Sequence, residues 1–124
     1  MYNNNVKFSF RARLASFRYA FQGLWHILKY EHNSRIHLIA AIMALLLGAF
    51  FHISKTDWLV IILCIGLVFS AEIANSLIEM LVDLVSPEKN EKAGKIKDIA
   101  AGGVLVAALV ALVAGIIVFL PYLV

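Results

Sequence analysis

Three long apolar stretches constrain this chain more than any other feature. Residues 58–71 and 99–124 contain no charged residue, and residues 36–51 are apolar apart from His37. About 20 consecutive apolar residues cross the hydrocarbon core of a bilayer as a helix. The last stretch is long enough alone, and the first two are long enough when their semi-polar ends lie among the lipid headgroups. We therefore predict transmembrane helices at about residues 34–52, 57–84 and 97–122.

Composition supports the same class of protein. Hydrophobic residues make up 62% of the 124 residues and charged residues 15%, and the mean hydropathy is +0.86. A soluble domain has an apolar share of roughly one half. The one cysteine, Cys64, lies in the middle of the second span and cannot form an internal disulfide. We predict a single all-α membrane domain over residues 1–124.

The segment before the first span has its own periodicity. It has no compact apolar region and cleavage site of the kind found in a secretory signal peptide. Apolar residues instead recur at spacings of four and three, which predicts an amphipathic helix over about residues 6–30. Its apolar stripe could lie on the membrane surface or pack on the protein's own helical bundle. The stripe consists of Phe10, Leu14, Phe17, Phe21, Leu24 and Leu28.

The distribution of Lys and Arg predicts the orientation in the membrane. Six basic residues lie in residues 1–35 and four lysines lie in residues 86–97, whereas residues 52–57 contain only Lys55. Because Lys and Arg accumulate on the cytoplasmic side, we expect the N-terminus and the loop at 86–97 to face the cytoplasm. The C-terminus would then face outward.

One face of the second span is acidic. Glu72, Asn75, Glu79 and Asp83 are spaced i, i+3, i+7 and i+11, so on a helix they share about one quarter of the circumference. Acids within a membrane helix are costly enough to be candidates for function. The predicted topology brings this face to the cytoplasmic side.

Other polar residues reach the same membrane depth. Glu31 and Arg35 stand at the cytoplasmic start of the first span, and Lys97 and Asp98 at that of the third. Mg²⁺ favours a few carboxylates together with substrate phosphates, and phosphoryl transfer needs positioning and charge neutralisation. The P-loop and protein-kinase motifs are absent from the sequence, so spacing alone does not define a nucleotide site.

Two sequence runs carry a family resemblance. Residues 72–83 follow the pattern E-x-x-N-x-x-x-E-x-x-x-D, and residues 94–103 contain Lys97-Asp98 followed by small residues. Together with residues 23–25 and 31–37, they resemble the prokaryotic integral-membrane diacylglycerol kinase family, especially its undecaprenol kinase branch. The resemblance covers about residues 8–115. It implies an ATP- and Mg²⁺-dependent kinase that phosphorylates a membrane lipid alcohol, undecaprenol or diacylglycerol, at the cytoplasmic interface.

The resemblance also implies roles for individual residues. Glu72 matches the general base, and Glu31 and Glu79 match the ligands of the metal ions. The matches to nucleotide contacts are Tyr19, Glu31, Glu79, Glu88, Lys89, Asn90, Lys97 and Asp98. The matches to lipid-contacting or supporting residues are Asn33, Arg35, Asn75 and Asp83. The family further implies a homotrimer with sites shared between neighbours, in a bacterial inner membrane, and we expect no nucleic-acid partner.

Some positions depart from the enterobacterial pattern, among them Ala12, Asn90 and Ala101. These departures bear on substrate choice more than on reaction type. The segment at residues 33–37 favours undecaprenol over diacylglycerol, although no single residue distinguishes a polyprenyl chain from two acyl chains.

Plainer interpretations stay open. Glu72 and Glu79 could be buried structural groups, Asp83 could be simply solvated, and Asp98 could be a first-turn acid that the helix dipole favours. The four histidines, His26, His32, His37 and His52, have no ligand-like pairing and are interpreted as interfacial or packing residues. Two other functions compete with a kinase: a proton or ion translocator that uses the carboxylates as a relay, and a non-catalytic membrane subunit.

Overall fold

The computed structural model describes residues 7–124, and all regular secondary structure within them is helical. Three helices are long and apolar enough to cross a membrane. This confirms the predicted all-α membrane fold with an additional N-terminal helix. The expected start of that first helix near residue 6 lies outside the described residues. The helices are α1 (Phe10–Tyr30), α2 (His32–Phe51), α3 (Lys55–Val85) and α4 (Glu91–Leu123).

Polar side chains cap the starts of three helices. The Ser9 hydroxyl accepts a hydrogen bond from the Ala12 N–H at the start of α1, and Ser54 does the same for Asp57 at α3. Asn90 Oδ1 accepts from the Lys92 N–H at 2.8 Å. Side chains of this type satisfy N–H groups that the first helical turn leaves unpaired. Because Asn90 supplies such a cap, α4 begins at Glu91, earlier than the expected start near residue 97.

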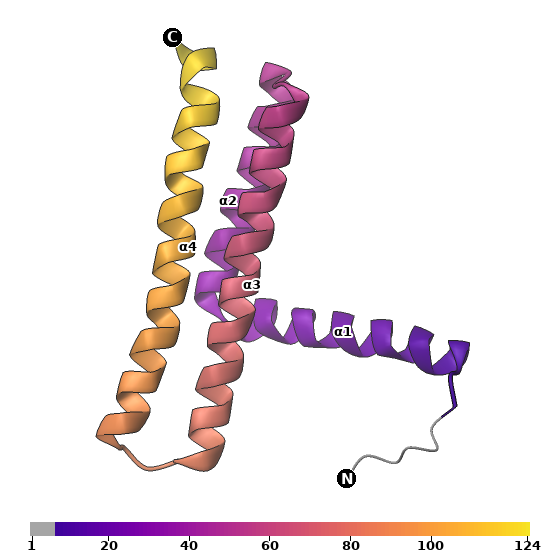
Figure 1. Ribbon diagram of the computed structural model, residues 1–124, viewed down its shortest axis with the longest axis vertical. Coiled ribbons are helices and arrows are strands. Elements are labelled where there is room, and N and C mark those ends of the chain that lie inside the picture. The colour runs from indigo at the N-terminus through magenta and orange to yellow at the C-terminus, as the bar shows by residue number, and fades with distance from the viewer. Residues whose placement is uncertain (1–6) are drawn as a thin grey trace.

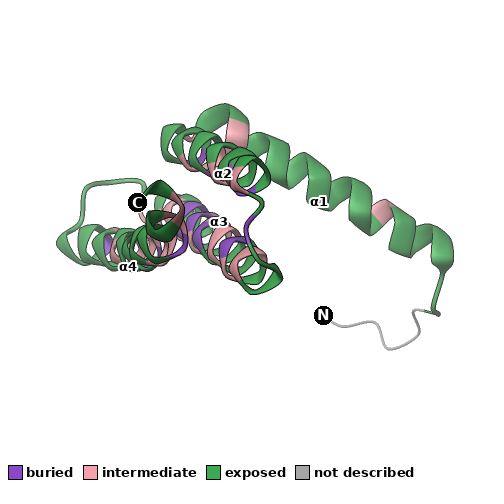
Figure 2. Cartoon of the chain, turned by 90° about the horizontal axis from the view of Figure 1, so that it is seen from above, coloured by how far each residue is buried: buried purple, intermediate pink, exposed green. Residues whose placement is uncertain are grey.

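The three long helices lie side by side, and α3 occupies the middle position (Figure 1, Figure 2). Its most extensive packing is with α4, and α2 covers another side of it less fully. α1 packs mainly against α2 and extends away from the bundle to one side (Figure 1). This arrangement is that of a helix on a membrane surface joined to a bundle that crosses the membrane.

Unequal helix lengths determine which residues project beyond the membrane. α2 has 20 residues, whereas α3 has 31 and α4 has 33. At 1.5 Å per residue, these lengths are about 30, 46 and 50 Å, against a hydrocarbon core of about 30 Å. A short turn joins α2 to α3 at the upper end of Figure 1, so α3 and α4 extend below the level of α1. The turn between α3 and α4 therefore lies on the side of α1 away from the membrane core.

The end of the bundle opposite the α3–α4 turn is closed by a small core. Ile53, Ile61 and Val118 are buried there, with Trp58 and other half-buried residues packed around them. The Tyr122 hydroxyl donates to Asp57 Oδ2 at 3.0 Å and accepts from the Ser54 N–H at 3.4 Å. These contacts tie the end of α4 to the start of α3.

The apolar stripe of α1 is not covered by the bundle. Phe10 is 77% exposed, Leu14 70% and Phe21 69%, whereas only Leu28 at the α2 end of the stripe is half-buried. Within the protomer, the stripe is therefore available to lipid. Of the two arrangements open from the sequence, this geometry favours the surface helix.

Buried residues recur at intervals of seven along both α2 and α3. Those of α2 are Ser34, Ala41 and Gly48, and those of α3 include Ile61, Val68 and Asn75. A seven-residue repeat keeps one seam of each helix facing its partner. Because the helices are antiparallel, the start of α2 lies beside the later turns of α3 (Figure 1).

Close approach at Gly48 gives a prediction about stability. A Cβ at this position would lie 2.8 Å from one carbon of the Trp58 ring and 3.1 Å from Ile53 Cδ1. We expect Gly48→Ala to lower the free energy of unfolding by about 1–3 kcal/mol through overpacking, measured by thermal unfolding in detergent.

Gly66 provides the matched control, because a Cβ added there has no heavy atom within 4 Å. Gly66→Ala should leave the unfolding temperature unchanged or raise it, since Ala favours helix over Gly by up to about 1 kcal/mol. An unfolding temperature for Gly48→Ala equal to that of Gly66→Ala would contradict the packing described.

Candidate active site

The acidic face of α3 passes from the interior of the bundle to its surface. Glu72 is 1% exposed and Asn75 7% exposed, whereas Glu79 is half-buried and Asp83 is exposed. Eleven residues of helix correspond to about 16 Å along the axis. The four residues therefore form a graded path that runs toward the α3–α4 turn, not a compact cluster.

Four buried polar atoms have no hydrogen-bond partner among the described residues. They are Ser34 Oγ, Glu72 Oε1, Asn75 Oδ1 and Ser76 Oγ, and we call these residues the polar seam. Ser34 belongs to α2 and the other three to α3. Leaving a buried polar group unpaired costs about 1–3 kcal/mol. Such a concentration of unpaired groups is unusual for a native protein and indicates that water, a ligand or another subunit completes the seam.

His37 is the neighbour that α2 presents to the buried carboxylate. Its Nε2 lies 3.1 Å from Glu72 Oε1, with 22% of the histidine side chain and 2% of the glutamate side chain exposed. No hydrogen bond joins the two groups, and Oε1 has no hydrogen-bond partner among the described residues. The contact is therefore a close polar pairing at 3.1 Å.

The same contact defines the register between α2 and α3. Because the helices are antiparallel, a residue one turn before His37 on α2 lies at the same height in the bundle as a residue one turn after Glu72 on α3. Ser34 therefore comes level with Asn75 and Ser76, which gathers the polar seam in one place. Continuing in the same direction brings the start of α2 level with Glu79.

Glu31 occupies that start. It has an extended backbone (φ −108°, ψ 115°) and separates α1 from α2. Arg35 holds this junction, because its Nε donates to the Leu28 carbonyl at 3.0 Å and its Nη2 to the Lys29 carbonyl at 2.6 Å. These are among the last carbonyls of α1, which have no partners within the helix.

The register brings three carboxylates to neighbouring levels. Glu31 and Glu79 come level with each other about two turns along α3 from Glu72. Even so, no group of three His, Cys, Asp or Glu side chains within residues 7–124 is arranged to hold a metal ion. The protomer thus offers two half-buried carboxylates, Glu31 and Glu79, beside a fully buried third.

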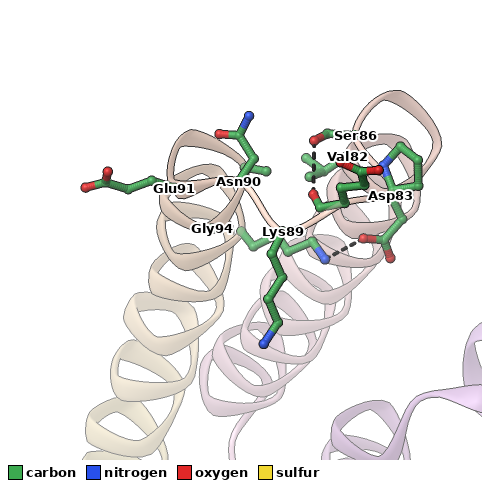
Figure 3. A pocket seen from close by; sticks show the side chains of 11 residues that line it. Val82, Asp83, Ser86, Lys89, Asn90, Glu91 and Gly94 are labelled. Atoms are coloured by element: carbon green, nitrogen blue, oxygen red, sulfur yellow. Dashed lines mark hydrogen bonds and ion pairs between the residues drawn. The ribbon is translucent and has the colours of Figure 1, made fainter.

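A second polar feature lies at the α3–α4 turn. A pocket of about 460 Å³ opens between the end of α3 and the start of α4 (Figure 3). Lys97 Nζ donates to Asp83 Oδ1 across it, and the Ser86 hydroxyl donates to the Glu88 carbonyl at 3.3 Å. Five of the residues that the sequence associates with the site line this pocket: Asp83, Glu88, Lys89, Asn90 and Lys97.

The remaining sequence candidates lie elsewhere. Tyr19 is 61% exposed on α1, and Asp98 is exposed on α4 outside the lining of the pocket. Asn33 is exposed at the start of α2. The structure therefore groups the candidates into two sets, one around Glu72 and one around Lys97, with Glu79 between them along α3.

Sequence reasoning missed part of the first set. It interpreted His37 as an interfacial or packing residue, and it did not single out Ser34 or Ser76. A signal was available for His37, because it is the only ionisable residue in residues 36–51 and such residues in membrane spans are candidates for function. The two serines had no comparable signal, because short hydroxyl side chains are common in membrane helices.

Comparison with known proteins defines the class. The model of the prokaryotic diacylglycerol kinase family matches residues 18–119. The undecaprenol kinase of Bacillus subtilis is 38% identical over 108 residues, which cover 87% of this chain and 88% of that protein. The diacylglycerol kinase of Synechocystis is 34% identical (87% and 62% covered), and that of Escherichia coli K12 is 29% identical (91% of each covered).

The three membrane-length helices and these matches together define the class of protein as a membrane lipid kinase. The chain belongs to the prokaryotic diacylglycerol kinase family. Membership makes ATP its phosphate donor and a bacterial membrane its location.

The Arg35 contacts lead to a prediction about the junction. Hydrogen bonds from a charged donor contribute about 1.5–3 kcal/mol, so Arg35→Met should allow the last turn of α1 to fray. We expect amide hydrogen exchange in residues 26–32 to become at least about 10-fold faster. Arg11→Met is the control, because Arg11 is an exposed residue of α1 far from the junction. Equal exchange in the two variants would contradict a clamping role for Arg35.

Proposed function

We propose that this protein transfers the γ-phosphoryl group of ATP to the hydroxyl of a membrane lipid alcohol, with Glu72 as general base. The observation that carries the proposal is a carboxylate 1% exposed near the membrane level marked by α1, on the helix whose end lines the pocket that contains Lys89 and Lys97. A lipid hydroxyl resides at that level, whereas ATP arrives from water. A general base must reach the proton that it removes, and this position meets that requirement.

In the proposed reaction, each bond that forms is matched by a bond that breaks. The O–H bond of the lipid breaks and its proton moves to the Glu72 carboxylate. The lipid oxygen forms a bond to the γ-phosphorus while the bond from that phosphorus to the bridging oxygen breaks, and ADP leaves. Phosphoryl transfer relies mainly on positioning and on stabilising charge. Lys97 is suited to the second task, because its ammonium lies at the pocket.

Glu31 and Glu79 fit the role of Mg²⁺ ligands. Mg²⁺ is usually held by one or two protein carboxylates, with water and substrate phosphates completing its coordination. Two half-buried carboxylates next to Glu72 are a donor set of this kind. When bound, the metal would neutralise charge on the phosphates, and the two carboxylates would hold it beside the base.

The pocket at the α3–α4 turn is the proposed site for the phosphates of the nucleotide. Lys97 would contact phosphate, and residues 88–90 would line the entrance. Asp83 holds the Lys97 side chain at the pocket. Tyr19 and Asp98 are proposed to meet the adenosine part, and Asn33, Arg35 and Asn75 to support the lipid site.

For the lipid, we propose undecaprenol. Supporting observations are the segment at residues 33–37 and the identity of 38% with a protein named undecaprenol kinase, against 34% and 29% with two named diacylglycerol kinases. The proposed orientation places the N-terminus and the α3–α4 turn in the cytoplasm, because basic residues concentrate there.

We also propose a homotrimer whose sites are shared between neighbours. Much of the apolar surface of the three spans has no partner within the protomer, and the polar seam contains unpaired atoms. A second subunit could satisfy both. A native mass of three protomers in detergent would support this assembly, and a monomeric mass would contradict it.

A translocator is a weaker alternative. A proton relay needs a continuous series of polar groups across the membrane. Above Glu72, the described part of α3 has Cys64 as its one ionisable residue before Asp57, and α2 has none beyond His37. This long apolar interval supports a one-sided site.

Replacement of the base gives the most direct prediction. General bases contribute about 100-fold to 10,000-fold, so Glu72→Gln should lower kcat by that factor while the Kd for ATP changes less than about twofold. Lipid phosphorylation and nucleotide titration provide the two measurements.

Asp57→Asn is the control for this experiment. It removes an acid at the opposite end of the same helix and retains an oxygen that can accept from Tyr122. This variant should keep the wild-type kcat. A Glu72→Gln enzyme with a wild-type rate would remove Glu72 from the role of base.

The pocket yields a prediction about the nucleotide. Hydrogen bonds to charged groups contribute about 1.5–3 kcal/mol, so Lys97→Ala should raise KM for ATP by about 10-fold to 100-fold. Lys95 is exposed and does not line the pocket, and Lys95→Ala should therefore keep KM within about twofold. The same increase in both variants would indicate a general effect of charge and contradict the assigned site.

A further inference from the structure

His37 is the only ionisable residue among residues 36–51, which make up most of α2, and its side chain contacts α3. Among residues 7–124, Glu72 provides the only carboxylate within 4.0 Å of its ring. The imidazole is 22% exposed and the carboxylate 2% exposed on the side-chain scale. A contact so well shielded from water is screened much less by salt than a surface pair.

The residues around the His37 imidazole offer it few other hydrogen-bond partners. His37 stands at one end of an apolar pocket of about 280 Å³ between α2, α3 and α4, whose lining includes Cys64, Phe69 and Ala111. The apolar residues offer no strong hydrogen-bond acceptor to the ring. Its Nε2 consequently faces one strong partner, Oε1 of Glu72.

Glu72 in turn needs something to orient it. A glutamate side chain has three rotatable bonds, and neither Ser34 nor Ser76 hydrogen-bonds to this carboxylate although both are buried nearby. Glu31 and Glu79, the other acids toward this end of the bundle, repel a carboxylate when they are ionised. Among the described residues, His37 is the one basic side chain within 4.0 Å of the Glu72 carboxylate.

We propose that His37 is a positioning residue, which holds Oε1 of Glu72 so that the second carboxylate oxygen faces the hydroxyl of the lipid. This proposal rests on the proposed function of Glu72 as base. His37 itself does not contact the reacting atoms. A misplaced base loses rate with little loss of substrate affinity, because reacting atoms must lie about 3–3.5 Å apart in a productive geometry.

A purely structural role for His37 makes a different prediction. If the contact only held α2 against α3, its loss would lower the unfolding temperature, and any polar replacement would behave alike. A positioning role predicts a selective loss of kcat. It also predicts rescue by a side chain with an N–H donor at the same reach.

Two substitutions separate these roles. His37→Leu removes the donor and keeps an apolar side chain in the seam, whereas His37→Gln retains an N–H donor near the position of Nε2. We expect His37→Leu to lower kcat at least about 10-fold with KM for ATP within about twofold. His37→Gln should recover at least about one third of the wild-type kcat.

His52→Asn is the matched control. It changes a histidine at the other end of α2, where the backbone is left-handed (φ 52°), a conformation that Asn tolerates. Its kcat should equal that of the wild type. In the Glu72→Gln background, His37→Leu should cause no further loss, because the two residues act as a unit.

The outcomes are distinguishable from failure of the proposed function. A wild-type protein without lipid kinase activity would overturn the function itself. An active wild type with an equally active His37→Leu variant would overturn the positioning role alone. Equal inactivity of the Leu and Gln variants together with a lowered unfolding temperature would also overturn it, in favour of a structural contact.

Discussion

The energetic cost of placing carboxylates in a membrane determines the rest of this structure. An acid at the centre of a transmembrane helix costs about 2.5–3.5 kcal/mol on insertion scales. α3 nevertheless carries Glu72, Glu79 and Asp83. Its length provides the solution, because α3 and α4 continue past the level of α1 (Figure 1). Glu79 and Asp83 thereby lie toward water, and Glu72 alone stays buried, where His37 provides a partner.

In the proposed function, this arrangement separates two tasks along one helix. The buried end of the acidic face, which meets α2, would receive the lipid hydroxyl, and the exposed end, which meets α4 at the pocket, would receive the nucleotide. Glu79 lies between the two, and Glu31 reaches the same level through the junction held by Arg35. The γ-phosphate would extend from the pocket toward the level of Glu72, because the lipid oxygen bonds directly to phosphorus.

The sequence predicted the acidic face well, because helical spacing alone places Glu72, Asn75, Glu79 and Asp83 on one side. It also predicted three spans, because apolar length is a strong signal in a membrane protein. It did not predict the contact of His37, because the pattern along α2 does not specify which face packs on α3. The start of α4 at Glu91 depends on the cap of Asn90. This cap is a local signal that the length of an apolar stretch does not contain.

The central claim is phosphate transfer from ATP to a lipid alcohol. The most direct test incubates the purified full chain in lipid nanodiscs with Mg²⁺ and γ-labelled ATP, and with undecaprenol and diacylglycerol in equal amounts. We expect label to enter lipid and most of it to be found in undecaprenyl phosphate. Predominant labelling of diacylglycerol would contradict the proposed substrate, and ATP turnover without label in either lipid would contradict phosphate transfer itself.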